Sequence, residues 1–404
     1  MKTGRATTGC RISAVGVVTS LGIDGEATWR RLRTGDTTAL RRRDDLVSGA
    51  SLLVAAVTEP LPEVPATLAR HACRNNALSL AALLQIERAL REAIAGIAPE
   101  RVGVVMGSST AGIASTECAV AAHARDGTLP GAFDYVQLEL GGVAEFVADY
   151  VGARGPCYTI STACSSGAKA LVSARSLLTL GLCDVVIAGG TDSLCRTTAN
   201  GFLALKALAH DTSLPFSLHR SGFTLGEGSA VFVLTRDRDG IQLAGAGESS
   251  DAHHMSAPHP DGAGAEAAMR AALADADLAP DGIHYVNLHG TATALNDVME
   301  GRAIHRVFGD RVPCSSTKPL VGHTLGASGA IEAAVCWLAI DAARDGWLPL
   351  PPHVWDGVSD PDIPAVRLAG CGEAVFAGRR PTLLSNSFGF GGNNCSLILA
   401  GGSA

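Results

Sequence analysis

The chain has 404 residues, a formal net charge of −7, 47% hydrophobic residues, 18% charged residues and 4% aromatic residues. The apolar fraction excludes an intrinsically disordered chain, and the net negative charge with few lysines argues against a nucleic-acid-binding surface. The 47 glycines show no three-residue period, which excludes collagen. The length supports one large domain or a few ordinary ones with an ample core.

Short β-branched runs alternate with alanine- and leucine-rich stretches along the chain. The expected strands are 11–17, 101–106, 184–188, 230–235, 284–288, 313–317, 382–387 and 395–400. The expected helices are 77–95, 143–151, 167–179, 263–275, 298–307 and 329–343. This alternation predicts an α/β protein whose sheets are covered by helices on both faces.

No targeting or membrane segment is expected. The apolar run from Ile12 to Leu21 ends without a cleavage pattern of small residues, so it is expected to form the first strand. No stretch reaches ~18 uninterrupted apolar residues, so no transmembrane helix is expected. The 11 cysteines are dispersed and form no Cys-x-x-Cys pair. This pattern indicates a reduced, cytoplasmic protein that uses cysteine mainly as a small core residue.

Cys164 stands in a context unlike that of the other cysteines. The segment 158–168 runs from an extended stretch through small hydroxyl residues into a predicted helix, which places Cys164 at a strand-to-helix turn. Free N–H groups and the positive end of the helix dipole at such a turn favour a thiolate and can bind a developing oxyanion. Cys164 is therefore a candidate nucleophile; the alternative is a buried cysteine beside Ser165 as the N-cap.

Two histidines follow predicted strands and lie beside glycines. His289 precedes Gly290, and His323 follows Gly322 in a glycine-rich connection that leads into a helix. The carboxyl ends of strands are where α/β folds place ligands, so both imidazoles are candidates for a site, although a lone histidine is more often structural.

Two further segments leave alternatives open. The spacing of His253, His254 and His259 fits no standard zinc motif, so a loop near the site is expected there instead of a metal centre. The glycine-rich segment 386–394 opens no helix and is therefore not a dinucleotide-binding loop. Its Phe388 and Phe390 are either a gate over an apolar pocket or part of a plain hairpin.

These segments together resemble the elongating β-ketoacyl-acyl carrier protein synthases, members of the thiolase-fold condensing enzymes. The main matching motifs are TACSSG at 162–167, HGTAT at 289–293, STKPLVGHTLGASG at 316–329 and NSFGFGGNN at 386–394. Supporting matches are VIAGGTDS at 186–193, GFTLGEGSA at 222–230 and SDAHHMSAPHPDG at 250–262. The resemblance covers nearly the whole chain.

The resemblance implies a thiolase-like layered α/β fold (α-β-α-β-α) of two similar halves with mixed five-stranded sheets. Residues 1–245 would form the half with the nucleophilic cysteine, and residues 246–404 the half with the two histidines. A soft joint at 237–247 lies at this division, while no linker and no sequence repeat is visible.

The resemblance also implies a catalytic set. Cys164 would accept the acyl chain, and His289 and His323 would bind the malonyl thioester carbonyl and promote decarboxylation. Lys318 would maintain the geometry and electrostatics around His323, with Glu332 in the same buried polar network. Loss of CO₂ leaves an enolate, which two imidazoles can stabilise as donors, and an apolar site disfavours the starting carboxylate.

Further roles follow from the same resemblance. The backbone amides of Cys164 and Phe390 would form the oxyanion hole. The implied substrate-binding residues are Thr291 and Thr293 for the phosphopantetheine arm, Phe388 and Phe390 as the gate, and Phe202 and Thr110 for the acyl pocket. Neither a metal nor a bound cofactor is expected, since the phosphopantetheine arm is carried by the acyl carrier protein.

The implied activity is acyl transfer from carrier protein to Cys164 and decarboxylative condensation with malonyl-acyl carrier protein, extending a fatty-acid or polyketide/polyene chain by two carbons. The expected partners are acyl- and malonyl-loaded carrier protein and a second chain, identical or a related synthase. The alternative is a partner subunit of the chain-length type, but such subunits lack the cysteine. Thiolases need a second catalytic cysteine, and starter-unit synthases carry Asn where His323 stands.

Several positions depart from the common family pattern. Ala292-Thr293-Ala294 replaces Ser-Thr-Pro, Ser217 replaces Asp, and Asn393 replaces Thr. They suggest a specialised pathway, and the segment 70–76 looks closest to synthases of aryl polyene clusters. A basic patch at the site mouth, drawn from arginines such as Arg42, Arg43 and Arg70, is expected to attract the acidic carrier protein.

Overall fold

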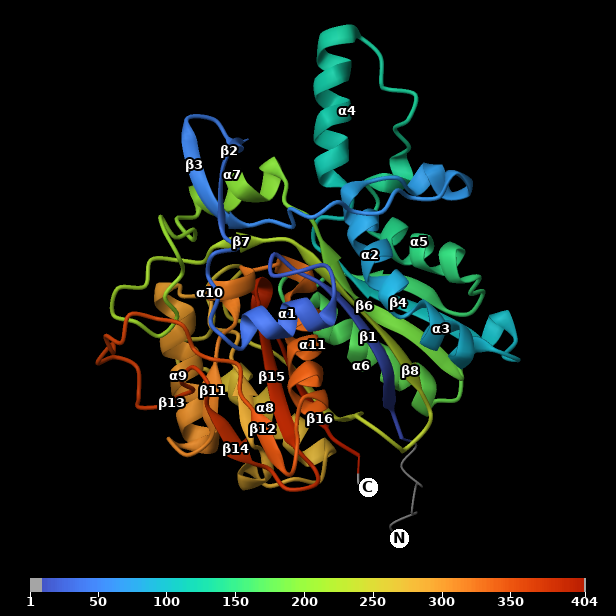
Figure 1. The fold of residues 1–404 in the computed structure, drawn as a ribbon. Helices are drawn as coiled ribbons and strands as arrows, with labels where there is room; N and C mark the ends of the chain where they lie inside the picture. Colours follow the sequence, from blue (N-terminus) through green and yellow to red (C-terminus); the bar gives the residue numbers. More distant parts are fainter. Residues whose placement is uncertain (1–8, 403–404) are drawn as a thin grey trace.

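Two five-stranded sheets form the frame of the fold (Figure 1). The computed structural model describes residues 9–402. Across the first sheet, the strands are β5 (Cys157–Ile160), β4 (Val102–Gly107), β6 (Val185–Asp192), β8 (Gly228–Thr235) and β1 (Arg11–Val18). Across the second, they are β11 (Pro313–Ser315), β10 (Tyr285–Asn287), β15 (Thr382–Gly389), β16 (Asn393–Ala400) and β9 (Gln242–Ser250).

The two sheets have the same topology. Numbered within its own half, each sheet has the strand order 3-2-4-5-1. In both, the first three strands in this order are parallel and the remaining pairings are antiparallel. The expected pair of similar halves is therefore confirmed, although no repeat is visible in the sequence.

The sheets are continuous through one residue pair. Arg11 of β1 pairs with Gln242 of β9, and the combined sheet has 11 strands because β13 (Arg367–Leu368) adds an edge beside β11. Two small sheets lie outside this frame. They consist of β2 (Arg41–Val47), β3 (Ala50–Ala55) and β7 (Leu225–Gly226), and of β12 (Trp347–Pro349) and β14 (Ala374–Phe376).

Helices form three layers around the sheets. The central layer holds α6 (Ser166–Thr179) and α11 (Ser328–Asp341), which each follow the third strand of their half. One outer layer holds α2 (Arg74–Gln85), α3 (Glu87–Ile94) and α5 (Gly141–Val151), and the other holds α8 (Ala263–Asp275) and α9 (Ala294–Phe308). The remaining helices are α1 (Gly25–Leu32), α4 (Ile113–Asp126), α7 (Arg196–Ala204) and α10 (Lys318–Val321).

The short 3₁₀ segments are η1 (Ala66–His71), η2 (Pro99–Arg101), η3 (Tyr135–Gln137), η4 (Pro280–Gly282), η5 (Leu325–Ala327) and η6 (Phe390–Gly392). The largest core cluster joins α6 and α11 to strands of both halves. A helix enclosed in this way must be apolar on every side, and α11 buries both its faces with small residues such as Ala333, Ala334 and Cys336.

Most expected elements are present, but one helix is divided. The single helix expected over 77–95 is two helices, α2 and α3, because Ile86 leaves the helical conformation at φ −110° and ψ 10°. Just before this break, the Gln85 side chain accepts from the backbone N–H of Val17 and donates to its carbonyl, both at 3.0 Å. These hydrogen bonds tie the end of α2 to β1 directly before the break.

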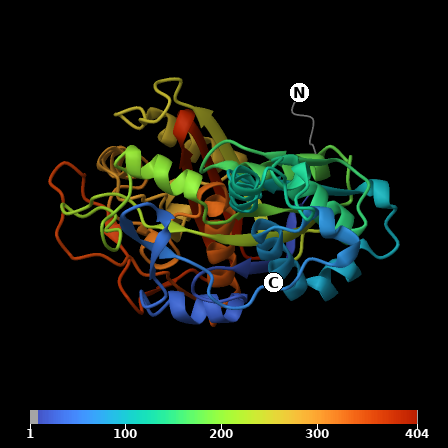
Figure 2. The ribbon, with the colours of Figure 1, turned by 90° about the horizontal axis from the view of Figure 1, so that it is seen from above.

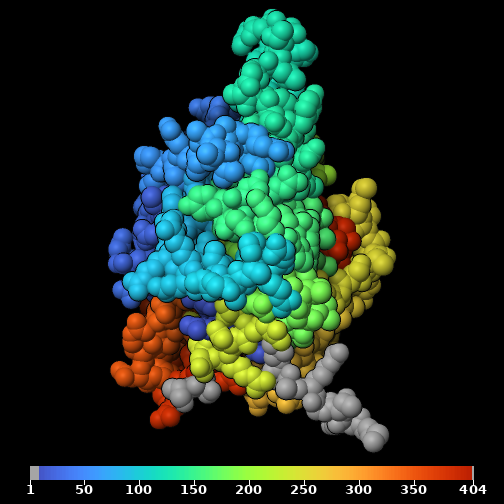
Figure 3. All heavy atoms as spheres, turned by 90° about the vertical axis from the view of Figure 1, so that its right-hand side faces the viewer, coloured from blue at the N-terminus to red at the C-terminus, as the bar shows by residue number. Residues whose placement is uncertain are grey.

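The sequence patterns gave no expectation for α1, α4 or α7, nor for the β2–β3 hairpin. Helix α4 forms an arm that rises clear of the rest of the molecule (Figures 1 and 3), and Figure 2 looks down along its axis. At its base, the Glu117 carboxylate accepts from the backbone N–H groups of Arg196 and Thr197 at the start of α7, at 3.0 and 2.6 Å. The arm is thus anchored to α7.

The cysteines are distributed as the sequence predicts. All 11 are free, and only Cys118, Cys157 and Cys371 are exposed. Among residues 9–402, no helix combines the length and apolar character needed to cross a membrane.

Candidate active site

Cys164 lies in a strained turn between β5 and α6. Ala163 adopts a positive φ of 52°, which costs an L-residue of order 1 kcal/mol or more. Hydroxyl groups stabilise the turn: Ser165 Oγ donates to the carbonyl of Thr162 at 2.8 Å, and Ser166 Oγ accepts from the N–H of Thr162 at 2.9 Å. The small hydroxyl residues of this motif therefore hold the sulfur at the N-terminus of α6.

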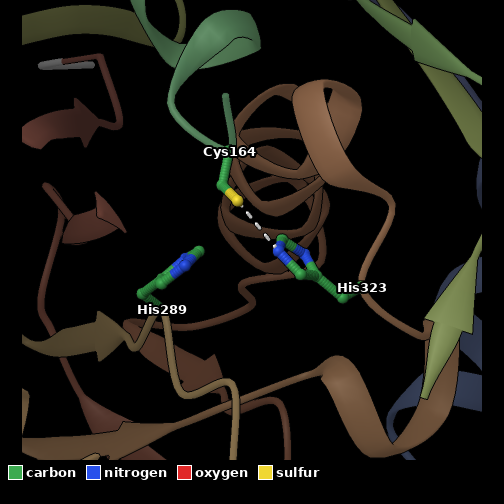
Figure 4. A group of neighbouring side chains, drawn as sticks. All are labelled: Cys164, His289 and His323. Carbon is green, nitrogen blue, oxygen red and sulfur yellow. Dashed lines mark hydrogen bonds between the residues drawn. The ribbon is translucent and has the colours of Figure 1, made fainter. Parts of the chain in front are cut away.

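His323 is held by β7 from the opposite side of the site. Its backbone N–H donates to the carbonyl of Thr224 at 2.7 Å, and its carbonyl accepts from the N–H of Gly226 at 3.0 Å. The ring of Phe223 packs edge-on against the imidazole at 4.9 Å. In this position the Nε2 atom of His323 lies 3.0 Å from the sulfur of Cys164 (Figure 4).

His289 follows β10 and is positioned by a buried carboxylate of α9. Glu300 accepts from the backbone N–H groups of His289 and Gly290, both at 2.7 Å. One turn earlier in α9, Asp297 accepts from the N–H of Ala292 at 3.1 Å. The sequence analysis missed both carboxylates; their signal is a pair of acids spaced by three residues in the first turns of a predicted helix.

The site is a junction of the two halves. Cys164 comes from the first half, whereas His289 and His323 come from the second, and Figure 4 shows the three side chains converging. The sulfur of Cys164 and one ring nitrogen of each histidine all lie within 4.8 Å of one another. The centres of the two imidazole rings are 5.4 Å apart, and the ring planes meet at 82°. The residues that the sequence singled out are thus brought together.

Lys318 and Glu332 form a fully buried ion pair behind His289. The ammonium of Lys318 donates to Glu332 Oε1 and to the carbonyl oxygen of His289, and it lies 3.5 Å from Nδ1 of His289. Ser328 Oγ donates to the same oxygen of Glu332 at 3.1 Å. The expected polar network exists, but Lys318 contacts His289 and not His323.

Burial keeps the three central groups neutral. It lowers the pKa of both imidazoles well below the usual value, and the positive charge of Lys318 acts in the same direction. Burial also raises the pKa of Cys164 to about 11, although Lys318 and the N–H of Phe390 act against this rise. Burial therefore opposes the resting thiolate that a position at a helix N-terminus was expected to favour.

The backbone of the glycine-rich turn approaches the sulfur closely. The N–H of Phe390 donates to Cys164. A Cβ atom at Gly389 would lie 2.9 Å from the carbonyl oxygen of Thr162, so glycine is needed where this segment passes the turn that holds Cys164. The segment is a hairpin between β15 and β16, and its two phenylalanines also line the site.

A cavity of about 240 Å³ opens above the three side chains. The expected residues that line it are Cys164, Phe202, His289, Thr291, Thr293, His323, Phe388 and Phe390. Phe202 packs edge-on against Phe390 at 6.1 Å, and Phe388 lies 6.0 Å from His289. Ser256, Ala257 and Pro258 also line the cavity, which places the histidine-containing loop beside the site.

Thr110 does not line this cavity, contrary to expectation. It is fully buried, and its hydroxyl donates to Asp192 at 2.7 Å. Asp192 also accepts from the N–H of Ala327, four residues after His323, at 3.1 Å. A short polar residue in this loop is needed to satisfy a buried carboxylate, so Thr110 supports the connection into α11.

The proposed arginine patch is also absent from the cavity wall. Arg42 pairs with Asp211 at 2.8 Å, and Arg43 pairs with Asp45 at 2.6 Å, so neighbouring carboxylates offset both charges. Neither they nor Arg70 lines the cavity.

Comparison with known proteins identifies the family. Residues 10–240 match "Beta-ketoacyl synthase, N-terminal domain" and residues 241–351 match "Beta-ketoacyl synthase, C-terminal domain". The chain belongs to the beta-ketoacyl synthase family. The family assignment made from the motifs is therefore confirmed, and with it the assignment to condensing enzymes of the acyltransferase type.

Two individual relatives support this family assignment. The chain is 41% identical over 267 residues to 3-oxoacyl-[acyl-carrier-protein] synthase 2 of Rhizobium meliloti, an alignment that spans 61% of each protein. It is 33% identical over 417 residues to Nodulation protein E of Rhizobium leguminosarum bv. trifolii, covering 96% of this chain and 97% of the relative.

A solved structure confirms the thiolase-like fold. A chain in the structure of "Ketosynthase (ApeO) in Complex with its Chain Length Factor (ApeC)" from Xenorhabdus doucetiae is similar with a TM-score of 0.92 and 42% identity, over 100% of both chains.

Replacing Lys318 by Ala is expected to raise the pKa of His289. The substitution removes a positive charge 3.5 Å from Nδ1 and leaves the carboxylate of Glu332 unpaired. Burial, the larger cause of the lowered pKa, remains. His289 should therefore become protonated at a higher pH than in the original protein, and NMR titration of its ring measures this.

Lys318→Arg is the matched control, because it retains the charge and should keep the pKa of His289 low. Lys169→Ala removes a lysine that pairs with Glu248 instead and should leave the titration unchanged. Equal titration of His289 in Lys318→Ala and Lys318→Arg would contradict the electrostatic assignment.

Proposed function

We propose that the protein is a β-ketoacyl-acyl carrier protein synthase. The observation that carries the proposal is the convergence of Cys164, His289 and His323 on one cavity beside a backbone N–H donor. A nucleophile, neutral hydrogen-bonding groups and an oxyanion donor are the parts that acyl transfer followed by condensation requires.

In the first step, the sulfur of Cys164 attacks the thioester of an acyl-loaded carrier protein. Because the resting thiol is neutral, its proton must leave as the bond forms, and Nε2 of His323 lies 3.0 Å away to receive it. The proton then passes to the departing phosphopantetheine thiolate, which leaves as a thiol. The N–H groups of Cys164 and Phe390 stabilise the oxyanion.

In the second step, malonyl-carrier protein loses CO₂ and leaves an enolate. Lys318 approaches Nδ1 of His289 as a donor, so the proton of the neutral ring lies on Nε2 and can be donated to the malonyl carbonyl oxygen. Donation by a neutral ring stabilises the developing enolate in a buried site. The enolate carbon then attacks the acyl group on Cys164 and breaks its bond to sulfur, so the β-ketoacyl product leaves and the Cys164 thiolate takes up a proton from the solvent.

We propose that the cavity takes the phosphopantetheine arm that the carrier protein brings to the site. Thr291 and Thr293 face one another at 3.0 Å between their hydroxyl oxygens and can contact the polar phosphopantetheine. We assign the role of a gate to Phe388 and Phe390, which line the cavity, and that of an acyl-pocket residue to Phe202, which packs against Phe390.

We further propose that a second chain, identical or related, covers the arm and the edge strand β5. Strand β5 is the outer strand of the sheet, so its free edge offers backbone groups for pairing. Exposed apolar side chains gather near this edge and after the arm, namely Leu129, Tyr135, Leu138, Leu140 and Tyr158. The similar ketosynthase structure contains a chain length factor, which supports a related chain as the partner.

The presence of Cys164 favours the catalytic subunit over the chain-length type of partner. For the pathway, we retain an aryl polyene-type system, supported by the segment 70–76 and by the full-length similarity to the ApeO complex. A cytoplasmic location is supported by the 11 free cysteines, which suit a reducing compartment.

Cys164→Ala is expected to abolish formation of the β-ketoacyl product, with a loss of about 10³-fold or more because no acyl-enzyme can form. The measurement is mass analysis of carrier-bound products after incubation with acyl- and malonyl-carrier protein. Cys371→Ala, a change at an exposed cysteine, is the control and should retain the activity. Product formation at the original rate by Cys164→Ala would refute the proposed function.

Tyr135→Asp is expected to weaken association with the second chain, because it places a charge in the proposed apolar contact. Phe376→Asp is the matched control, since both side chains are 66% exposed and Phe376 belongs to the distant strand β14. Sedimentation analysis measures the assembly state. Equal dissociation of both variants, or of neither, would contradict this surface.

A further inference from the structure

The three central side chains also have the composition of a metal site. Within residues 9–402, Cys164, His289 and His323 are the one group of three or more potential ligands whose atoms lie mutually within 4.8 Å, and all three are buried. Thiolate sulfur and imidazole nitrogen are the ligands that zinc prefers, whereas Mg²⁺ and Ca²⁺ prefer oxygen.

The spacing fits a tetrahedral ion. Zinc binds sulfur at about 2.3 Å and nitrogen at about 2.0–2.1 Å, which separates the ligand atoms of a tetrahedral site by about 3.3–3.6 Å. In the structure the Sγ–Nε2 distance of Cys164 and His323 is 3.0 Å, and no separation within the group exceeds 4.8 Å. Side-chain rotations that move the ligand atoms by a fraction of an ångström to about one ångström would therefore create the site.

The fourth coordination position faces the cavity. All three ligands line the same space of about 240 Å³, so a water molecule can complete the coordination. Three protein ligands with one open position are typical of a zinc site that exchanges its fourth ligand, whereas a structural zinc site has four protein ligands.

One neighbouring charge opposes the ion. The ammonium of Lys318 lies 3.5 Å from Nδ1 of His289 and adds to burial in lowering the pKa of both imidazoles, but Glu332 pairs with it directly and offsets part of its charge. Nδ1 of His323 has no hydrogen-bond partner among the described residues, so the ring can carry its proton there while Nε2 binds a metal.

We propose that Cys164, His289 and His323 bind zinc or a similar divalent cation, and that this ion reversibly inhibits the protein. Binding forms one sulfur–metal bond and two nitrogen–metal bonds, and the thiol proton of Cys164 is released to the buffer. The sulfur lone pair is then unavailable for attack on a thioester. The inhibition rests on the proposed function, whereas the binding itself does not.

Isothermal titration of the metal-free full chain with zinc chloride tests the binding. We expect one zinc ion per chain at this site and an affinity at least about tenfold lower in Cys164→Ala, His289→Asn and His323→Asn. Cys371→Ala, at an exposed cysteine, should bind as the original protein does. Unchanged affinity in Cys164→Ala and in either histidine variant would overturn the site.

Alkylation by iodoacetamide, followed by peptide mass analysis, provides a second readout that needs no enzymatic activity. Zinc should slow alkylation of Cys164 at least tenfold, leave Cys371 unaffected, and lose this effect in His289→Asn or on addition of EDTA. Unchanged alkylation of Cys164 at saturating zinc would refute the proposal. If zinc protects Cys164 but no β-ketoacyl product forms without zinc, the proposed function fails and the metal site stands.

Discussion

Helices α6 and α11 cross so closely in the central layer that no side chain fits at the contact. A Cβ atom at Gly167 of α6 would lie 2.9 Å from the backbone N of Ala330 in α11, and one at Gly329 of α11 would lie 2.9 Å from the backbone N of Ala168 in α6. Each helix follows the equivalent strand of its half, so this crossing brings the two preceding turns together. Cys164 and His323 occupy those turns, and their 3.0 Å separation depends on the crossing.

The close packing also sets the chemistry. Because the three side chains are buried, the imidazoles and the thiol favour their neutral forms, and the buried charges form a pair between Lys318 and Glu332. Charge therefore develops only during the reaction, where fixed donors are already in place. Such pre-arranged donors stabilise a transition state more than they would in water, since no solvent must reorganise. The same convergence makes the sulfur and nitrogen atoms a suitable ligand set for zinc.

The sequence predicted the parts of the site that depend on local structure. The turn at Cys164, the glycines beside His289 and His323, and most strands follow from short-range patterns and from motifs shared with the beta-ketoacyl synthases. What it could not predict depends on burial and tertiary contact. The raised pKa of the Cys164 thiol, the bond from Thr110 to Asp192 and the hydrogen bonds of Gln85 to Val17 all involve groups far apart in the chain.

The account requires that Cys164 carries the acyl chain between the two steps. Intact-mass and peptide analysis of the protein after incubation with acyl-carrier protein alone tests this most directly. The account predicts one acyl group per chain on the Cys164 peptide, which disappears when malonyl-carrier protein is added and reappears as a product longer by two carbons. Absence of the adduct, or an adduct that persists after malonyl-carrier protein is added, would contradict it.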